Sequence, residues 1–134
     1  KGMTPEAVVD LLTGSVFSVY MLGFLPGFPY LGGVPEAMDM PRLASPRKVV
    51  PARSSAIAGR MCAAYPWESP GGWRLLGRTP IRLFDAANAR RPALLAPGDQ
   101  VVWEAIDRAT YDELDCECAA GHFDLARLMR EGGI

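Results

Sequence analysis

The sequence has 134 residues, of which 49% are hydrophobic and 22% are charged, as expected for one globular domain with one core. Its formal net charge of −1 gives no electrostatic basis for binding nucleic acid or an anionic membrane surface. No apolar run reaches the roughly 20 residues that span a bilayer, and the N-terminal stretch lacks the apolar region of a secretion signal. We therefore expect a cytoplasmic protein, and the odd number and spacing of Cys62, Cys116 and Cys118 fit that reducing compartment.

The chain is expected to begin with a short helix that leads into a strand. Thr4 is a good N-cap, Pro5 suits the first helical position, and Gly14 offers a left-handed C-cap. The apolar face of this helix comprises Val8, Leu11 and Leu12. Residues 15–22 are rich in β-branched and aromatic side chains, which favour a strand.

Glycine and proline then cluster between residues 23 and 98, which predicts short elements joined by defined turns. The stretch GFLPGFPYLGG (residues 23–33) is interpreted as a loop, and residues 40–54, with prolines five residues apart, as an extended edge. Short strands are expected at residues 56–58, 60–65, 73–77, 81–84 and 101–106. Two helical patterns follow, one with a capping box from Thr110 to Glu113 and one through Leu125, Leu128 and Met129. This order of elements predicts a β-barrel or sandwich with a helical end.

Two loops carry large aromatic side chains on backbone that glycine and proline make unusual. In ESPGGWRLLGRTP (residues 68–80), Trp73 follows two glycines, and in GFLPGFPYLGG three aromatic residues lie among four glycines and two prolines. Plugging the end of a barrel explains any one of these rings. Together they indicate a binding pocket, because pockets are mostly apolar and aromatic with a few placed polar groups. Arg60 is assigned to this pocket, whereas Arg78 is expected to form a structural ion pair with Glu68 or Asp85.

The cysteines are expected to be structural. CECAAGH (residues 116–122) offers three metal ligands, whereas structural zinc sites normally need four, so no metal is expected. Cys62 lies in a predicted strand, but the sole histidine, His122, is distant in sequence, which favours a small core residue over a nucleophile. The chain has no serine-hydrolase signature and no glycine-rich nucleotide loop, so it is not expected to bind ATP by itself.

Four motif strings together resemble the allophanate hydrolase subunit 1 family. They are VYMLGFLPGFPYLGG, MPRLASPRKVVPA, AIAGR followed by YPWESPGGWRLLGRTPIRLFD, and PALLAPGDQVVW, and they cover about residues 4–107. That family includes a subunit of bacterial ATP-dependent 5-oxoprolinase, the sporulation kinase inhibitor KipI and one half of the carboxyltransferase domain of urea carboxylase. The resemblance implies a mainly β, cyclophilin-like closed β-barrel with flanking short helices. It implies a single cyclophilin-like domain over residues 1–134, with a family core at 4–107, a helical tail at 108–134 and no N-terminal family domain.

The resemblance also implies a function. Family members act with a companion subunit of related fold, and the complex activates an amide or lactam with ATP bound elsewhere. We therefore expect a substrate pocket at the interface with an allophanate hydrolase subunit 2-type chain, in a complex that hydrolyses C–N bonds of cyclic amides. The catalytic residues stay unassigned, and the chain itself is expected to bind no cofactor. The expected pocket residues are Tyr30, Arg60, Met61, Cys62, Tyr65, Glu68, Ser69 and Trp73.

The sequence departs from the family pattern at polar positions. Leu12 stands where family members commonly have histidine, and Phe17 where they commonly have tyrosine. Met61 and Cys62 stand where they commonly have glutamine and threonine, so a site that used these groups to hold a lactam would lose affinity. Two alternatives therefore stay open: a KipI-like regulator of a histidine kinase, and a diverged member that acts on a more apolar substrate. Prolyl isomerase activity would rest on fold analogy alone.

Overall fold

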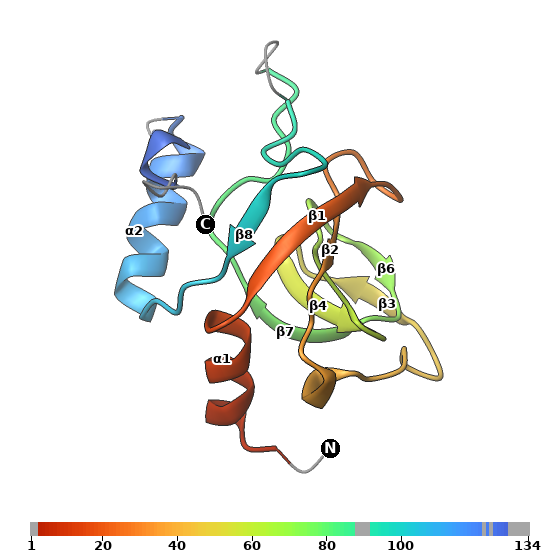
Figure 1. Cartoon of the computed structure of the whole chain (residues 1–134). Helices are drawn as coiled ribbons and strands as arrows, with labels where there is room; N and C mark the ends of the chain where they lie inside the picture. The colour runs from red at the N-terminus through yellow and green to blue at the C-terminus, as the bar shows by residue number, and fades with distance from the viewer. Residues whose placement is uncertain (1–2, 88–91, 122, 124, 129–134) are drawn as a thin grey trace.

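The chain is mainly β, as the sequence predicts, with short helices beside two antiparallel sheets (Figure 1). This computed structural model describes residues 3–87, 92–121, 123 and 125–128. The strands are β1 (Val16–Leu22), β2 (Pro29–Gly32), β3 (Arg47–Val50), β4 (Ser54–Ala58), β5 (Met61–Ala64), β6 (Ser69–Gly71), β7 (Arg74–Arg78) and β8 (Gln100–Val102). The helices are α1 (Pro5–Thr13), η1 (Glu36–Met38), α2 (Arg108–Ala119) and η2 (Leu125–Leu128).

The larger sheet has six strands in the order β7-β4-β5-β2-β1-β8, and the smaller sheet pairs β3 with β6. Strands β7 and β8 form the two ends of the larger sheet, and no ladder joins them among the described residues. Backbone pairing in this part of the chain therefore gives a curved six-stranded sheet, and its closure into the barrel that the resemblance implies stays a prediction.

Strand β2 corrects the prediction that GFLPGFPYLGG is wholly a loop. Its residues pair with both β1 and β5, so they lie in the middle of the larger sheet. Pro29 is tolerated there because it is the first residue of the strand, where a missing amide donor does least harm. The loop is confined to the residues between β1 and β2, where Gly27 has a φ of 78° and the Gly23 amide donates to the Phe28 carbonyl at 3.1 Å.

The other predicted strands are mostly present with shifted ends. The predictions at 56–58, 60–65 and 73–77 correspond to β4, β5 and β7, and the prediction at 101–106 shortens to β8. The expected edge at 40–54 contains β3, which pairs with β6, and β6 lies in the predicted loop at residues 68–80. The predicted strand at 81–84 is wrong, because only a single bridge from Phe84 to Ala93 forms there.

Helix α1 begins as predicted but ends differently. The Thr4 hydroxyl caps its first turn, and its apolar face packs against the sheet through Val8, Leu11 and Leu12. Gly14 has a φ of −86°, a right-handed conformation, whereas the sequence predicts a left-handed cap. The amide of Gly14 donates to the Asp10 carbonyl at 2.9 Å, and the Ser15 hydroxyl donates to the Leu11 carbonyl at 2.6 Å. These bonds satisfy the last carbonyls of the helix without a left-handed residue.

Each face of the larger sheet carries its own hydrophobic cluster. Because successive strand residues point to opposite faces, Ile57 joins one cluster while Ala56 and Ala58 join the other. Strand β5 divides in the same way between Cys62 and Ala63. The α1-side cluster comprises Phe17, Val19, Leu31, Val34, Met38, Ile57 and Cys62. The aromatic-side cluster comprises Phe28, Val50, Ala56, Ala58, Ala63, Tyr65 and Trp73.

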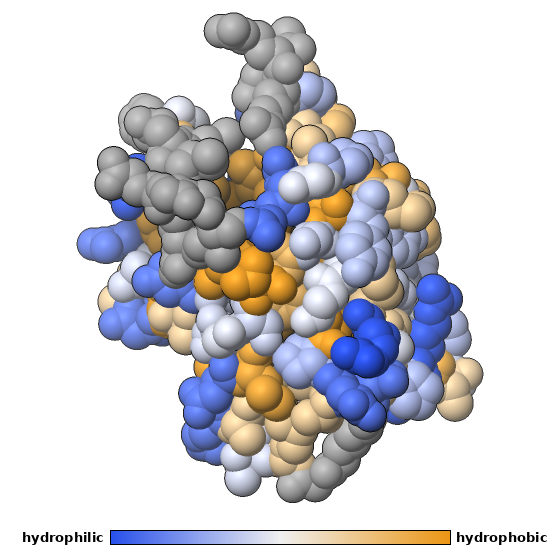
Figure 2. All heavy atoms as spheres, in the orientation of Figure 1, coloured by the Kyte–Doolittle hydropathy of each residue, from blue (hydrophilic) through white to orange (hydrophobic). Residues whose placement is uncertain are grey.

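Apolar residues are not confined to these clusters. Figure 2 shows them gathered near the centre of the view, over the part of the sheet where Figure 1 places β1 and β8. Val16 of β1 pairs with Val102 of β8 and is 43% exposed. Neither α1 nor α2 combines the length and apolar character that crossing a membrane would need.

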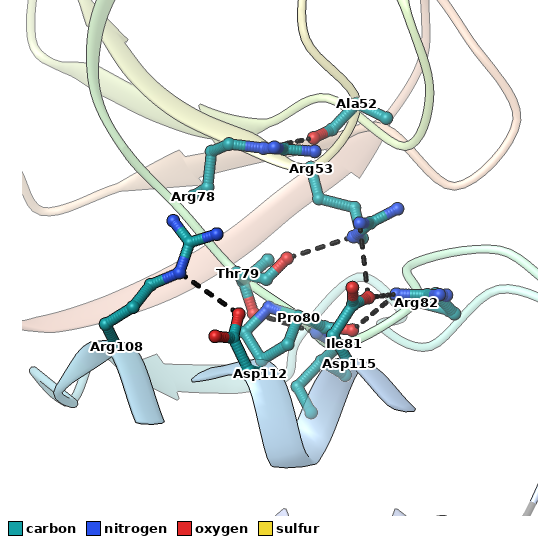
Figure 3. Close-up of polar contacts among 10 residues, drawn as sticks. All are labelled: Ala52, Arg53, Arg78, Thr79, Pro80, Ile81, Arg82, Arg108, Asp112 and Asp115. Atoms are coloured by element: carbon teal, nitrogen blue, oxygen red, sulfur yellow. Dashed lines mark hydrogen bonds and ion pairs between the residues drawn. The ribbon is translucent and has the colours of Figure 1, made fainter. Parts of the chain in front are cut away.

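Helix α2 lies at the surface, and none of its residues is fully buried. Its N-cap is Asp107, whose carboxylate accepts from the Thr110 amide at 2.8 Å, so the predicted capping box from Thr110 is wrong. Asp115 of α2 pairs with Arg82 at 2.5 Å and with Arg53 at 3.5 Å (Figure 3). The two arginines come from segments beside the larger sheet, so one carboxylate joins the helix to the sheet.

Replacing Asp115 with asparagine is expected to loosen helix α2 without unfolding the sheets. The hydrogen bond that Asp115 accepts from Arg82 lowers the pKa of this carboxyl. The stability that Asp115 contributes is therefore complete above the ordinary carboxyl pKa, and it is lost as the pH falls through the lowered value. Because the side chain is 39% exposed, we expect only about 0.5–1 kcal/mol, seen as roughly two- to fivefold faster hydrogen exchange of α2 amides. Asp112→Asn, which removes only a pair with Arg108 inside α2, should have less effect, and equal exchange rates would contradict the anchoring role.

Candidate functional site

The two glycine- and proline-rich loops meet on the aromatic-side cluster. The ring centroid of Phe28 lies 5.1 Å from those of Tyr30 and Tyr65, 5.4 Å from that of Phe24 and 5.9 Å from that of Trp73. Most of these pairs are edge-to-face, the arrangement that aromatic quadrupoles favour. We call the rings of Phe24, Phe28, Tyr30, Tyr65 and Trp73 the aromatic face.

Small residues make room for these rings. Ala56 and Ala58 of β4 and Ala63 of β5 lie beneath them, so the sheet offers a shallow floor on which large side chains can pack. Gly71 of β6 is equally necessary, because a Cβ there would lie 2.9 Å from Cζ and 3.0 Å from Cε2 of Tyr65. Small residues in β4, β5 and β6 thus make room for large rings that come from β2 and from the ends of other strands.

The outer edge of the aromatic face is exposed and locally strained. Phe24 is 63% exposed and has a φ of 67°, which is uncommon for a non-glycine residue. A β-bulge in β1 lies at Tyr20, whose ring is 62% exposed and lies over Gly32. Bulges and positive φ angles recur at functional positions, where they aim a side chain in a direction that regular structure does not allow.

Arg42 adds a positive charge to this face. Its guanidinium carbon lies 5.9 Å from the ring centroid of Trp73, within cation–π range. Burial raises the pKa of Tyr65, and the Trp73 amide and the Arg42 charge oppose that rise. Sequence reasoning missed Arg42, and the only available signal was its place in the motif MPRLASPRKVVPA.

The structure brings only some of the predicted pocket residues together. Those in or against the aromatic-side cluster are Tyr30, Met61, Tyr65 and Trp73. Ser69 is half-buried on β6 beside the exposed Glu68. Arg60 is exposed and donates to the Val34 carbonyl at 3.1 Å, and Cys62 lies fully buried on the opposite face of the sheet.

The ion pair predicted for Arg78 does not form. Its Nε donates to the Ala52 carbonyl at 3.0 Å (Figure 3). The reason is the strand register: β7 pairs Arg78 with Ser54 of β4, which brings the guanidinium beside the backbone that enters β4. Neither Glu68 nor Asp85 forms an ion pair with it in the described part of the chain.

The CECAAGH motif lies on and after helix α2. Cys116 is exposed and Cys118 is half-buried, while His122 lies outside the described residues. Within residues 3–87, 92–121, 123 and 125–128, no three histidine, cysteine, aspartate or glutamate side chains gather as metal ligands.

Comparison with known sequences identifies the family. Residues 1–95 match the family described as the carboxyltransferase domain, subdomain C and D. The chain belongs to this family. A 5-oxoprolinase subunit of Haemophilus influenzae is 50% identical over 98 residues, which are 73% of this chain and 46% of that protein. The corresponding 5-oxoprolinase subunit of Bacillus subtilis is 45% identical over 109 residues, or 81% of this chain and 45% of its own length. The chain therefore spans about half the length of these curated relatives.

Solved structures agree with this membership of the carboxyltransferase subdomain C and D family. An uncharacterized protein from Pyrococcus horikoshii matches with a TM-score of 0.77 and 44% identity, over 82% of this chain and 50% of that chain. Urea amidolyase from Kluyveromyces lactis matches with a TM-score of 0.79 and 25% identity, over 88% of this chain and 8% of that chain. These comparisons confirm the family resemblance that the four motif strings indicate.

Three of the four residues that differ from the expected family pattern lie in or against the α1-side cluster. Phe17 and Cys62 are fully buried in the α1-side cluster, and Leu12 packs against the same cluster. Apolar side chains at these positions bury one another, so they form part of a core. Met61 is the exception, because it packs against the aromatic-side cluster.

We expect the three thiols of this carboxyltransferase-family chain to react at very different rates. Burial raises the pKa of the Cys62 thiol to about 12, whereas Cys116 is exposed. Burial also raises the pKa of Cys118, which is half-buried. At pH 8 a thiol reagent such as Ellman's should therefore modify Cys116 first and Cys62 only on unfolding.

A Cys116→Ser variant should lose the fast phase of this reaction. Rapid labelling of Cys62 in the folded chain, located by mass spectrometry, would contradict its burial in the α1-side cluster. It would instead favour a nucleophilic role for Cys62. The raised pKa of Cys62 also makes the stability of the fold depend on pH. The contribution of the buried thiol to folding is complete below about pH 9, the ordinary pKa of a thiol, and is lost as the pH rises toward 12. Over that range the unfolded thiol releases its proton while the folded thiol keeps it.

Proposed function

We propose that this chain is part of a subunit in an ATP-dependent complex that processes amides or lactams in the cytoplasm. The names of its relatives support this, because 5-oxoprolinase and urea amidolyase both refer to enzymes of C–N bonds in amide-like substrates. The chain has no glycine-rich nucleotide loop of its own, so in this proposal ATP is bound elsewhere in the complex.

The observation that carries the proposal is the aromatic face. Tyr30 and Met61 are half-buried there, while Phe24 is 63% exposed. A small ligand is normally enclosed over most of its surface, which one open face does not achieve. A companion subunit of the allophanate hydrolase subunit 2 type, placed against this face, would complete the enclosure. The substrate pocket of the proposal therefore lies between the two chains.

The test is to mix the chain with its companion subunit and measure the mass by light scattering after size-exclusion chromatography. We expect a stable hetero-complex that hydrolyses 5-oxoproline with ATP. Phe24→Asp should weaken the complex by placing a charge in the interface, whereas Val9→Asp, on helix α1 at 44% exposure, should not. A folded chain that forms no complex and supports no turnover would overturn the proposal.

A second candidate is a KipI-like regulator that binds a histidine kinase. The exposed side chains of Tyr20, Met21 and Phe24 favour it, because large apolar side chains are typical anchors of protein interfaces. Binding to a purified sensor kinase without the companion subunit would distinguish this function. Met61, where the family pattern has an amide, favours a third option, a more apolar amide substrate. Tighter binding of such an amide than of 5-oxoproline would identify that option.

A further inference from the structure

Arg42 and Trp73 are held side by side by the residues that flank them. The Leu43 amide donates to the Gly72 carbonyl at 2.8 Å. On the other side, Nε of Arg74 donates to the Pro41 carbonyl at 2.8 Å. Both neighbours of Arg42 are therefore bonded to both neighbours of Trp73. This double tie fixes the backbone from which the guanidinium reaches the indole, so the pair is preorganised.

The guanidinium of Arg42 is available for a ligand. Arg53, Arg82, Arg108 and Arg127 pair with carboxylates, and Arg60, Arg74 and Arg78 donate to backbone carbonyls. Within the described residues, Arg42 has no such partner and only lies over Trp73. A guanidinium presents a planar fork of donors that matches a carboxylate in bidentate fashion.

Flat apolar surface lies directly beside this charge. Trp73 itself is only 6% exposed. The ring centroid of Tyr30 lies 5.9 Å from that of Trp73 and Tyr30 is half-buried, so the accessible apolar surface beside Arg42 belongs to Tyr30. The Arg42 charge also opposes the rise that burial causes in the pKa of Tyr65. A cation at the edge of a ring-lined surface suits a small ligand with an anionic group on one side and a compact ring on the other.

We propose that Arg42 binds the carboxylate of a ring-bearing ligand whose ring lies against Tyr30. The identity of the ligand rests on the proposed function: 5-oxoproline is a five-membered lactam that carries one carboxylate, and it satisfies both requirements. Neutral urea could accept a hydrogen bond from Arg42 but could not form the ion pair. This residue therefore favours an acidic lactam over urea as the substrate of the aromatic face.

The test compares Arg42→Gln with a matched control, Arg108→Gln. Arg108 also lies over a ring, 5.8 Å from the centroid of Tyr111, so both variants lose one charge and one cation–π contact, but on different elements. Arg108→Gln also loses the exposed pair with Asp112, inside α2. Binding is measured by calorimetry on the full-length protein that contains this chain. The companion subunit is included if the two form a complex. The probes are 5-oxoproline, its neutral carboxamide, benzoate and benzamide.

We expect wild type to prefer each carboxylate over its amide and to lose that preference as salt rises. Arg42→Gln should weaken 5-oxoproline binding at least about tenfold and carboxamide binding less, because only the carboxylate loses an ion pair. Arg42→Lys should be intermediate, and Arg108→Gln should bind like wild type. Because Arg42 is exposed, thermal unfolding should confirm that all variants stay folded.

The possible outcomes separate the two proposals. If 5-oxoproline binds equally to both glutamine variants, the role of Arg42 is overturned and the proposed function stands. If only benzoate binds, and needs Arg42, the carboxylate site stands and 5-oxoproline is excluded as its ligand. If neither carboxylate shows binding that depends on Arg42, the inference is wrong.

Discussion

Phe28→Ala is expected to lower the free energy of unfolding by about 3–5 kcal/mol. The side chain is 1% exposed and its ring contacts those of Phe24, Tyr30, Tyr65 and Trp73. Its removal would leave a cavity between rings that are themselves fixed by strands β2, β5 and β6. Such a cavity collapses poorly, so both the transfer free energy and the packing energy are lost. Urea denaturation followed by circular dichroism would measure the change.

Phe24→Ala is the matched control for this prediction. The same side chain is removed from the same cluster, but Phe24 is 63% exposed. We expect a loss below about 1 kcal/mol, because little apolar area leaves a buried environment. Equal losses in the two variants would mean that the rings do not pack around Phe28 as described. A ligand that binds the aromatic face should be affected by both variants, since Phe28 supports the rings and Phe24 borders them.

Gly71→Ala is expected to lower the free energy of unfolding by about 2–3 kcal/mol, although it adds only a methyl group. The new Cβ would overlap the hydroxyl end of Tyr65, whose side chain is 1% exposed and has no room to turn away. The neighbouring variant Gly72→Ala should be nearly neutral, because the nearest atom to its Cβ is 3.8 Å away. Thermal unfolding of the two variants gives a direct comparison.

A double variant identifies the cause of the Gly71 effect. Tyr65→Phe removes the hydroxyl that the new methyl group overlaps, so Gly71→Ala should cost less in that background. Unchanged cost would assign the effect to the backbone of β6 and not to the ring. Gly32→Ala offers a contrast, because the ring that its Cβ meets belongs to Tyr20, which is 62% exposed and free to rotate. That variant should be tolerated.

The elements that local patterns define were predictable, and those that depend on distant pairing were not. Helix α1 follows from Thr4, Pro5 and the spacing of its apolar residues. Strand β2 was missed because four residues between glycines and prolines carry no clear strand signal, and its place comes from pairing with β1 and β5. The start of α2 had a local signal in Asp107, but Thr110 offered a competing cap, and only the folded backbone selects between them.

The aromatic residues of the candidate site could be predicted from the sequence, but its charged residue, Arg42, could not. Tyr30, Tyr65 and Trp73 lie in motifs whose glycines and prolines mark them as unusual, and the structure brings them together. Met61 and Cys62 were grouped although adjacent strand residues face opposite ways, so this separation was available from the period of a strand. Arg42 was missed because its partner Trp73 is distant in sequence and no local pattern reports their contact.

Helix α2 and the two sheets depend on different properties of the solvent. The sheets are held by buried apolar side chains, which urea weakens and moderate salt does not. The helix is held through Asp115 and its two arginines, an attraction that dissolved ions screen over about 10 Å at 0.1 M. Rising ionic strength therefore weakens one of the attachments of α2 while the sheets stay folded.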